Sequence, residues 1–343
     1  MSTPIQYLSI QEFLQQSEDY LVLDVRAPKE YTKGHIPNAI SFPLFNDEER
    51  AAVGTAYKQQ SKEKAIEIGL DIVGKKMGDF ARSIRILTQE KKVFIHCWRG
   101  GMRSGALAWL INLLGYEVYI LQGGYKAYRQ NVLDDLATPL KLCVIGGETG
   151  SGKTEILYAL QNTGEQIIDL EKIANHKGSA FGGLGQAPQP KPEQFENNLH
   201  QALSRIDCKN ICWLEDESKS LGTCYIPEPF WLQLKAAPVF RIHLPEGRRI
   251  QHLMNQYASF SAETLSDCIR PLAKRMGTEA MNNALEALAH QQLEDVTKIM
   301  LRYYDKAYHF SATKKQHPIA EDLLFDNQSY QEIAAILIQK TRT

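Results

Sequence analysis

The sequence lacks any long hydrophobic segment and any excess of charge of one sign. No apolar run approaches the roughly 20 residues that a membrane-spanning helix needs, so we expect no membrane contact. The first residues, MSTPIQYLSIQEF, show no basic region followed by an apolar one, which argues against a secretory signal and predicts a cytoplasmic protein. The net charge is −1, so any nucleic-acid binding must depend on local clusters of Lys and Arg.

Cysteine is also scarce, with six residues scattered over 343. A reducing compartment makes a disulfide framework unexpected. Cys208 and Cys212 have the spacing C-x3-C, but no second Cys or His pair follows nearby at the spacing of a zinc finger. We therefore predict no metal site at these cysteines and interpret them as buried thiols of a strand.

The first 137 residues alternate between patterns typical of strands and of helices. Strands are predicted at 20–25, 39–42, 91–97 and 117–124, and helices over 47–92 and 104–117. This alternation is typical of an α/β domain with a parallel sheet and helices on its faces.

The pattern restarts near Thr138–Pro139, which we interpret as a domain joint. Strands are then predicted at 141–145, 165–170, 210–218 and 237–244, with a long Gly/Pro-rich loop over 176–195 and helices from Pro245 to the end. The predicted organisation is an α/β domain over 1–137, a second α/β domain over 138–247, and a helical region over 248–343 that packs on the second domain.

The stretch FIHCWRGGMRS places a cysteine and an arginine at the two ends of a short loop. Backbone N–H groups and a helix that begins near Ser104 would lower the pKa of the Cys97 thiol. Arg103 can hold an oxyanion, and the glycines allow the loop to close tightly. We predict Cys97 and Arg103 as catalytic residues, and the anion-binding loop between them as Trp98, Arg99, Gly100, Gly101 and Met102.

A second anion-binding motif follows about fifty residues later. GETGSGKT fits the phosphate-loop pattern G-x4-G-K-[ST], with a predicted strand before it and a helix after it. Its amides would wrap a diphosphate, its lysine would neutralise the charge, and its threonine could bind Mg²⁺. The predicted diphosphate-binding residues are Gly147, Gly150, Ser151, Gly152, Lys153 and Thr154. Glu215 and Asp216, which end a later strand, are either a second acidic motif or a solvated turn.

The segments LDVRAPKEYTKGHIPNAISFPL and LQGGYKAYR resemble the N-terminal and closing motifs of the rhodanese family, over about residues 1–137. The resemblance implies that Cys97 carries transferred sulfur as a persulfide and that Arg103 is the loop arginine. The spacing H-C-x5-R, however, is the loop length of cysteine-dependent phosphatases. Phosphate ester hydrolysis therefore stays open as an alternative, with Asp24 or Asp47 as the general acid.

The whole chain resembles the tRNA 2-selenouridine synthase family, in HCWRGGMRSGA, GGETGSGKTEIL, DLEKIANHKGSAFG and GTAYKQQS. The resemblance implies an enzyme that replaces sulfur of wobble 2-thiouridine (U34) in tRNA by selenium from selenophosphate, after geranylation of that sulfur by geranyl diphosphate. Cys97 could accept selenium as a selenosulfide, and the Gly-rich segment 178–185 could close over the prenyl chain. Neither ATP nor a redox cofactor is implied, and the enzyme that makes selenophosphate is a further expected partner.

A tRNA substrate needs basic residues to bind its phosphates. The candidates are Arg248, Arg249, Arg270, Lys274 and Arg275, together with Lys75, Lys76, Lys91 and Lys92. Tyr57, Trp98 and Tyr125 are candidates for stacking on an exposed base. A P-loop kinase joined to a sulfur-relay rhodanese domain stays open as an alternative, and it predicts ATP turnover.

Overall fold

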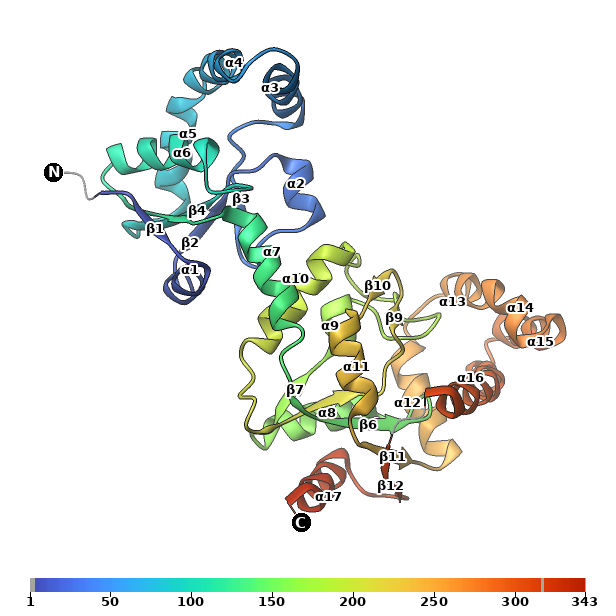
Figure 1. Cartoon of the computed structure of the whole chain (residues 1–343). Helices are drawn as coiled ribbons and strands as arrows, with labels where there is room; N and C mark the ends of the chain where they lie inside the picture. The colour runs from blue at the N-terminus through green and yellow to red at the C-terminus, as the bar shows by residue number, and fades with distance from the viewer. Residues whose placement is uncertain (1–3, 316–317, 343) are drawn as a thin grey trace. The chain divides into compact units, whose positions relative to one another are not determined.

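The computed structural model describes residues 4–315 and 318–342. The chain forms two compact units (Figure 1): the first contains the chain up to Asp135 together with Glu196–Gln201, and the second contains the rest. Each unit is built on a parallel sheet covered by helices. The predicted α/β class is therefore confirmed.

The first unit contains a five-stranded sheet in the order β1-β5-β4-β2-β3, with every neighbouring pair parallel. Its strands are β1 (Gln6–Leu8), β2 (Leu21–Asp24), β3 (Ile40–Ser41), β4 (Lys92–His96) and β5 (Glu117–Leu121). β4 lies in the middle of the sheet and is almost completely buried, which accounts for its continuous apolar sequence. The residue that follows β4 is Cys97.

The described residues up to Asp135 form seven helices. They are α1 (Ile10–Gln16), α2 (Pro28–Lys33), α3 (Asp47–Gln59), α4 (Lys62–Gly74), α5 (Met77–Leu87), α6 (Met102–Leu113) and α7 (Gly124–Asp135). The predicted helical stretch 47–92 folds as α3, α4 and α5. α3 begins after Asn46, whose side chain accepts from the Glu49 N–H while the Glu49 carboxylate accepts from the Asn46 N–H.

The second unit contains a five-stranded parallel sheet in the order β12-β11-β6-β8-β7. Its strands are β6 (Lys141–Gly147), β7 (Gln166–Ile168), β8 (Ile211–Glu215), β11 (Val239–His243) and β12 (Ile319–Leu324). A separate two-stranded hairpin consists of β9 (Ser220–Leu221) and β10 (Cys224–Tyr225). The expectation of helices from Pro245 to the end is wrong at β12. As an edge strand, β12 buries mainly Leu323 and so lacks the apolar run of a central strand.

Two groups of helices in the second unit pack around apolar cores. α8 (Lys153–Asn162) and α17 (Tyr330–Arg342) pack together beside the sheet, and they share an apolar core with the strands. A second apolar core includes Leu265, Leu288 and Met300. The helices that follow β11 are α12 (Glu246–Tyr257), α13 (Ala262–Ile269), the 3₁₀ turn η1 (Arg270–Leu272), α14 (Ala273–Met276), α15 (Thr278–Ala289) and α16 (Leu293–Lys315).

Three more helices connect the strands: α9 (Leu170–Ala174), α10 (Pro192–Leu203) and α11 (Glu228–Ala236). α10 starts at a proline inside the loop predicted over 176–195, since proline is well tolerated at the first helical position. The prediction for the two cysteines is half right: Cys212 is buried in β8, whereas Cys208 is exposed in the preceding turn. None of the described helices is both long and apolar enough to cross a membrane.

Candidate functional site

Cys97 lies where β4 ends and a short loop leads into α6. Its side chain is only 3% exposed, whereas Trp98 in the loop and Met102 at the start of α6 are exposed. The Gly101 N–H donates to Cys97 Sγ at 3.3 Å, and Ser104 Oγ lies 3.3 Å from the same sulfur. The loop therefore surrounds the thiol with hydrogen-bonding groups.

These groups lower the pKa of the Cys97 thiol below its ordinary value. Burial acts in the opposite direction, but it is outweighed by hydrogen bonds from the Ser104 side chain and from the backbone N–H groups of Ser104, Arg99 and Gly101. The result favours the thiolate, which is the nucleophilic form. The sequence analysis did not identify Ser104 as a sulfur ligand. Ser104 could have been predicted from its place in the sequence, because it is a hydroxyl residue directly after the loop arginine.

The motif LQGGYKAYR holds the Cys97 loop in place through backbone hydrogen bonds. The Tyr125 N–H donates to the Cys97 carbonyl oxygen at 2.8 Å, and the Lys126 N–H donates to that of Trp98 at 3.0 Å. Gly124 has a φ of +61°, and a Cβ added there would lie 2.4 Å from the Cys97 carbonyl oxygen. Only glycine allows this close approach.

Arg103 is held by an ion pair. Its Nη1 donates to Glu30 Oε2 at 2.7 Å, and Arg50 approaches the same carboxylate at 3.7 Å. Burial raises the pKa of Glu30, but the hydrogen bond and charge of Arg103 outweigh it, so the pKa stays below its ordinary value. A guanidinium has five N–H groups, and this pair therefore orients Arg103 without using up its donors.

The two carboxylates suggested as a general acid have different surroundings. Asp24 is completely buried, and Arg26 donates to both of its oxygens at 2.5–3.0 Å. Burial raises the pKa of Asp24, but nearby His96 and the contacts of Arg26 lower it below its ordinary value, so Asp24 stays ionised. Asp47 accepts from the Lys29 N–H in the first turn of α2 at 3.0 Å. The expectation that Asp24 donates a proton is therefore wrong, and Asp47 has a structural partner.

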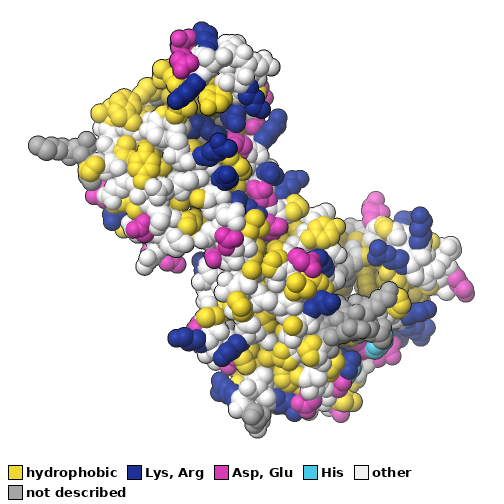
Figure 2. Space-filling model, viewed as in Figure 1, with side chains coloured by type: hydrophobic (Ala, Val, Ile, Leu, Met, Phe, Trp, Pro, Cys, Tyr) yellow, Lys and Arg dark blue, Asp and Glu magenta, His cyan; other side chains and the backbone are white. Residues whose placement is uncertain are grey.

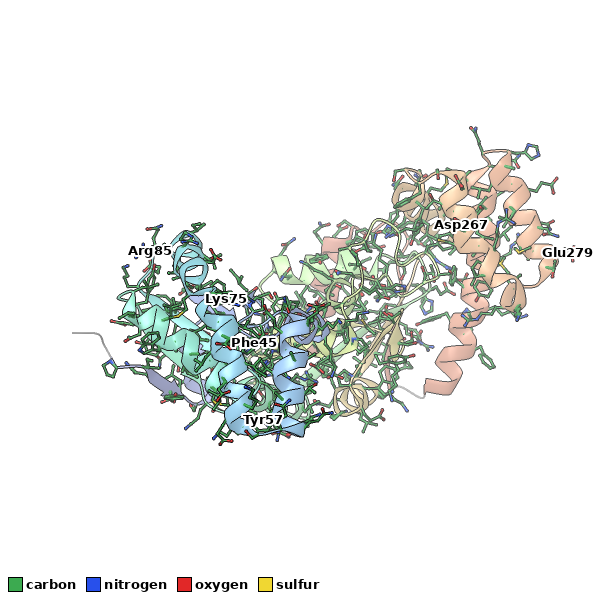
Figure 3. The ribbon with its side chains drawn as sticks, turned by 90° about the horizontal axis from the view of Figure 1, so that it is seen from above. Phe45, Tyr57, Lys75, Arg85, Asp267 and Glu279 are labelled. Carbon is green, nitrogen blue, oxygen red and sulfur yellow. The ribbon has the colours of Figure 1, made fainter. Side chains whose placement is uncertain are left out.

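The three aromatic candidates differ in exposure. Tyr125 is completely buried with the Arg26 guanidinium 3.6 Å from its ring centre, so the expectation that it stacks on a base is wrong. Trp98 is 36% exposed and Tyr57 is 56% exposed, and both can meet a base. Figure 3 shows Tyr57 and Lys75 at opposite ends of the α3–α4 hairpin.

The phosphate loop lies between β6 and α8, as its sequence predicts. Gly152 has a φ of +72°, and a Cβ there would lie 2.3 Å from the ring of Tyr330, so this position requires glycine. Lys153 Nζ donates to the Gly147 carbonyl oxygen at 3.1 Å, and the Gly147 N–H donates to the Tyr308 hydroxyl at 3.0 Å. A cavity of about 380 Å³ adjoins the loop. Of the predicted diphosphate ligands, all but the buried Ser151 line this cavity.

Three carboxylates meet in this cavity. The side chains of Glu171, Glu215 and Glu217 each place an oxygen within 4.8 Å of the others. Burial, and then the neighbouring carboxylates, raise the pKa of both Glu171 and Glu215, while Lys153 acts in the opposite direction. Oxygen ligands of this kind suit Mg²⁺, which would favour the ionised form of all three. The sequence analysis identified Glu215 and missed Glu171 and Glu217. The pattern E-D-E at 215–217 could have indicated Glu217.

An apolar pocket of about 70 Å³ adjoins the cavity. Both are lined by Thr149, Ser179, Leu253, Tyr257 and Tyr304, which form the boundary that the two spaces share. The pocket walls beyond this boundary are mainly apolar and include Phe181, Leu265, Val296 and Met300. The loop that supplies Ser179 and Phe181 is anchored on α16, because the Ala180 N–H donates to the Tyr304 hydroxyl at 3.2 Å.

Arg249 is not a surface residue. Its side chain is 4% exposed, and it donates to Glu148 at 2.7 Å and to the Thr149 carbonyl oxygen at 2.9 Å, with a further ion pair to Asp305. The expectation that Arg249 contacts tRNA is therefore wrong, because these bonds hold its guanidinium against the phosphate loop. Arg248 is half-buried and lies over the ring of Tyr330.

The other basic candidates are more accessible. Arg270, Lys274 and Arg275 are exposed on η1 and α14, and Lys75 is exposed after α4. Lys76 pairs with Glu49, and Lys91 and Lys92 lie over the rings of Tyr116 and Tyr20. Figure 2 shows basic and acidic side chains interspersed on the visible face of both units, in keeping with the net charge of −1.

Comparisons with known proteins match both units. A family model described as the tRNA 2-selenouridine synthase AAA domain matches residues 140–343, and a rhodanese-like domain matches residues 9–131. A tRNA 2-selenouridine synthase of Nitrosomonas europaea is 35% identical over 272 residues, which cover 76% of this chain and 70% of the relative. One of Shewanella woodyi is 34% identical over 334 residues, covering 87% of this chain and 89% of its own. A solved rhodanese-related protein of Thermoplasma volcanium is 21% identical, covering 37% of this chain and 92% of its own, with a TM-score of 0.24.

Proposed function

This chain belongs to the tRNA 2-selenouridine synthase family, and from that premise we propose that it replaces the sulfur of wobble 2-thiouridine (U34) in tRNA by selenium from selenophosphate. We further propose that the sulfur is first alkylated by geranyl diphosphate. The second unit performs the alkylation, and the Cys97 loop serves the exchange for selenium.

The observation that carries the alkylation is that the phosphate cavity adjoins the apolar pocket and shares five lining residues with it. An allylic diphosphate has a highly charged head and an apolar tail. The loop amides and Lys153 suit the head, and the pocket walls suit the tail. A nucleotide would place a polar ribose and base there, which favours the geranyl donor over the kinase alternative.

In the first step the sulfur of 2-thiouridine attacks the first carbon of the geranyl group. The C–S bond forms, the C–O bond breaks, and diphosphate leaves with the electron pair. Lys153 and the loop N–H groups stabilise the charge that develops on the leaving group. The oxygens of Thr154, Glu171, Glu215 and Glu217 would hold Mg²⁺ beside it, and the ion would supply further neutralising charge.

In the second step selenium at the selenide level attacks C2 of the modified uridine. The C–Se bond forms, and the C–S bond breaks as geranyl thiolate leaves. Alkylation thus turns the sulfur into a leaving group. Arg103 and the loop amides bind the anionic selenophosphate at Cys97.

The tRNA itself would be bound by exposed basic residues and by a stacking aromatic. Lys75, Arg270, Lys274 and Arg275 remain candidates for its phosphates, and Trp98 beside Cys97 is the better placed aromatic. The enzyme that makes selenophosphate is proposed as the supplier of the donor.

The test is nucleoside mass spectrometry on tRNA that carries 2-thiouridine. The protein with geranyl diphosphate alone should produce S-geranyl-2-thiouridine, and addition of selenophosphate should convert it to 2-selenouridine. An absolute requirement for ATP, with no geranylated product, would instead support the kinase alternative.

A further inference from the structure

We propose that the Cys97 thiolate attacks the phosphorus of selenophosphate, so that the loop cleaves the donor and releases selenide. Cys97 then carries a phosphoryl group and not selenium. The inference rests on the proposed use of selenophosphate, and it assigns the loop a phosphoryl-transfer activity.

The geometry of the loop suits a phosphoryl group. Five residues separate Cys97 from Arg103, which is the spacing that cysteine-dependent phosphatases use. The N–H groups of Arg99, Gly101 and Ser104 converge on Cys97 Sγ, and the first turn of α6 directs further N–H groups toward the same loop. Backbone N–H groups that surround a hollow in this way bind the oxygens of a tetrahedral anion. The sulfur then faces the central atom of that anion.

The electron count favours attack at phosphorus. Selenium in selenophosphate is already at the selenide level, and phosphorus is at its highest oxidation state. A thiolate that took selenium as a selenosulfide would leave the electron pair on phosphorus, and the product would be phosphite. Attack on phosphorus changes no oxidation state and requires no reductant.

The engagement of Asp24 and Asp47 fits the same step. A thiolate that cleaves a phosphate ester needs an acid, because an alkoxide is a poor leaving group. Asp24 is buried and held ionised by Arg26, and Asp47 is engaged with the Lys29 N–H. Hydrogen selenide ion (HSe⁻) is a weak base, so a donor that is protonated on selenium releases it without a general acid. The loop is therefore better suited to selenophosphate than to a phosphate ester.

The complete sequence balances with water as the only co-reactant. The S–P bond forms and the P–Se bond breaks, so selenium departs with the electron pair as HSe⁻ and keeps the proton that it carried in the donor. Hydrogen selenide then attacks C2 of the S-geranylated uridine, and geranyl thiol leaves. Water finally hydrolyses the S–P bond, which yields inorganic phosphate and restores Cys97.

The test follows phosphorus and selenium separately in the full-length protein. Wild-type protein is mixed with selenophosphate labelled with radioactive phosphorus, quenched at a series of times and digested. We expect the label on the Cys97 peptide, and ³¹P NMR should show inorganic phosphate as the product. Cys97→Ser should slow phosphate release by about a thousandfold or more, as expected on loss of a covalent nucleophile.

Cys208→Ser is the matched control, because it removes an exposed thiol in a turn of the second unit and should retain full labelling. Phosphite as the product, or selenium without phosphorus on Cys97, would overturn the proposal. So would the absence of label at every quench time. These wild-type measurements do not depend on whether a variant folds.

Failure of this inference can be distinguished from failure of the proposed function. If the wild type makes 2-selenouridine while Cys97 carries selenium alone, only the phosphoryl step is rejected. If the wild type does not convert S-geranylated tRNA with selenophosphate, the proposed function itself fails and the phosphoryl step fails with it.

Discussion

Ser104 illustrates how one hydroxyl group can set the reactivity of the buried thiol. Ser104 Oγ lies 3.3 Å from Cys97 Sγ, and its hydrogen bond lowers the pKa of Cys97 against the effect of burial. Because Ser104 stabilises the thiolate, Ser104→Ala should raise this pKa and move alkylation of Cys97 by iodoacetamide to higher pH. At pH 7 the rate should fall about tenfold, the scale of one hydrogen bond to a charged group.

Peptide mass spectrometry of the Cys97 peptide across a pH series measures this change. The exposed Cys208 is an internal reference, and its pH profile should be the same in both proteins. An unchanged Cys97 profile in Ser104→Ala would mean that the loop N–H groups alone stabilise the thiolate.

Arg249 is expected to be needed for folding more than for binding. It is 4% exposed and joins Glu148 and Asp305; Arg249→Ala would leave Asp305 without this ion pair and Glu148 with its contact to the exposed His309. We expect a loss of about 3 kcal/mol in the free energy of unfolding, the scale for breaking a buried ion pair. Urea denaturation measures it, with the half-buried Arg248→Ala as the matched control. A loss below that of the control would contradict the structural role.

The two anion loops could be identified from sequence because each is local. Cys97 and Arg103, or Gly147 and Lys153, lie within a few residues of each other, so their spacing alone indicates the chemistry. The partners of Arg249 could not be identified in this way, because Glu148 and Asp305 are 101 and 56 residues away. The glutamate cluster likewise joins α9 to the end of β8, which only the fold brings together.

At the scale of helices and strands, the degree of burial decides which strands could be predicted from the sequence and which could not. β4, β6 and β8 are central strands whose apolar runs identify them. β1 and β12 are edge strands that pair on one side and expose most of their residues, so their sequences carry little signal. The apolar pocket was missed for a related reason: its walls come from α12, α13, α16 and the Gly-rich loop.

The pocket walls should limit the length of the prenyl chain. Its volume of about 70 Å³ is about five to seven times the ~10–15 Å³ that one water needs, so the pocket suits a short chain, and we expect each added isoprene unit to require wall residues to move. Leu265→Ala should therefore raise the ratio of kcat/KM for farnesyl over geranyl diphosphate about tenfold or more. The reason is that one methylene more or less in a hydrophobic pocket changes kcat/KM about tenfold or more. Kinetics of tRNA alkylation with each donor measure this ratio.

Leu272→Ala is the matched control, because Leu272 belongs to the same apolar core but does not line the pocket. Thr297→Phe adds bulk at a half-buried wall position and should lower the use of geranyl while sparing the shorter dimethylallyl diphosphate. Equal changes in Leu265→Ala and Leu272→Ala would point to general loosening of the core and not to a length limit.

At the scale of the whole molecule, the chain joins two anion sites that handle different leaving groups. The second unit suits a diphosphate with an apolar tail, and the first suits a small anion at a thiolate. Alkylation by a diphosphate ester needs no thiol, so the two proposed steps should be separable by mutation.

Cys97→Ser should therefore stall at S-geranyl-2-thiouridine when supplied with geranyl diphosphate and selenophosphate. Lys153→Ala removes the charge that binds the diphosphate, so it should leave plain 2-thiouridine, with a loss of about tenfold to hundredfold in geranyl diphosphate affinity. Pre-geranylated tRNA should restore 2-selenouridine to Lys153→Ala but not to Cys97→Ser. Nucleoside mass spectrometry of tRNA digests distinguishes the three species. If Cys97→Ser makes no geranylated product, or if pre-geranylated tRNA fails to rescue Lys153→Ala, the two sites act together and the division into two steps is wrong.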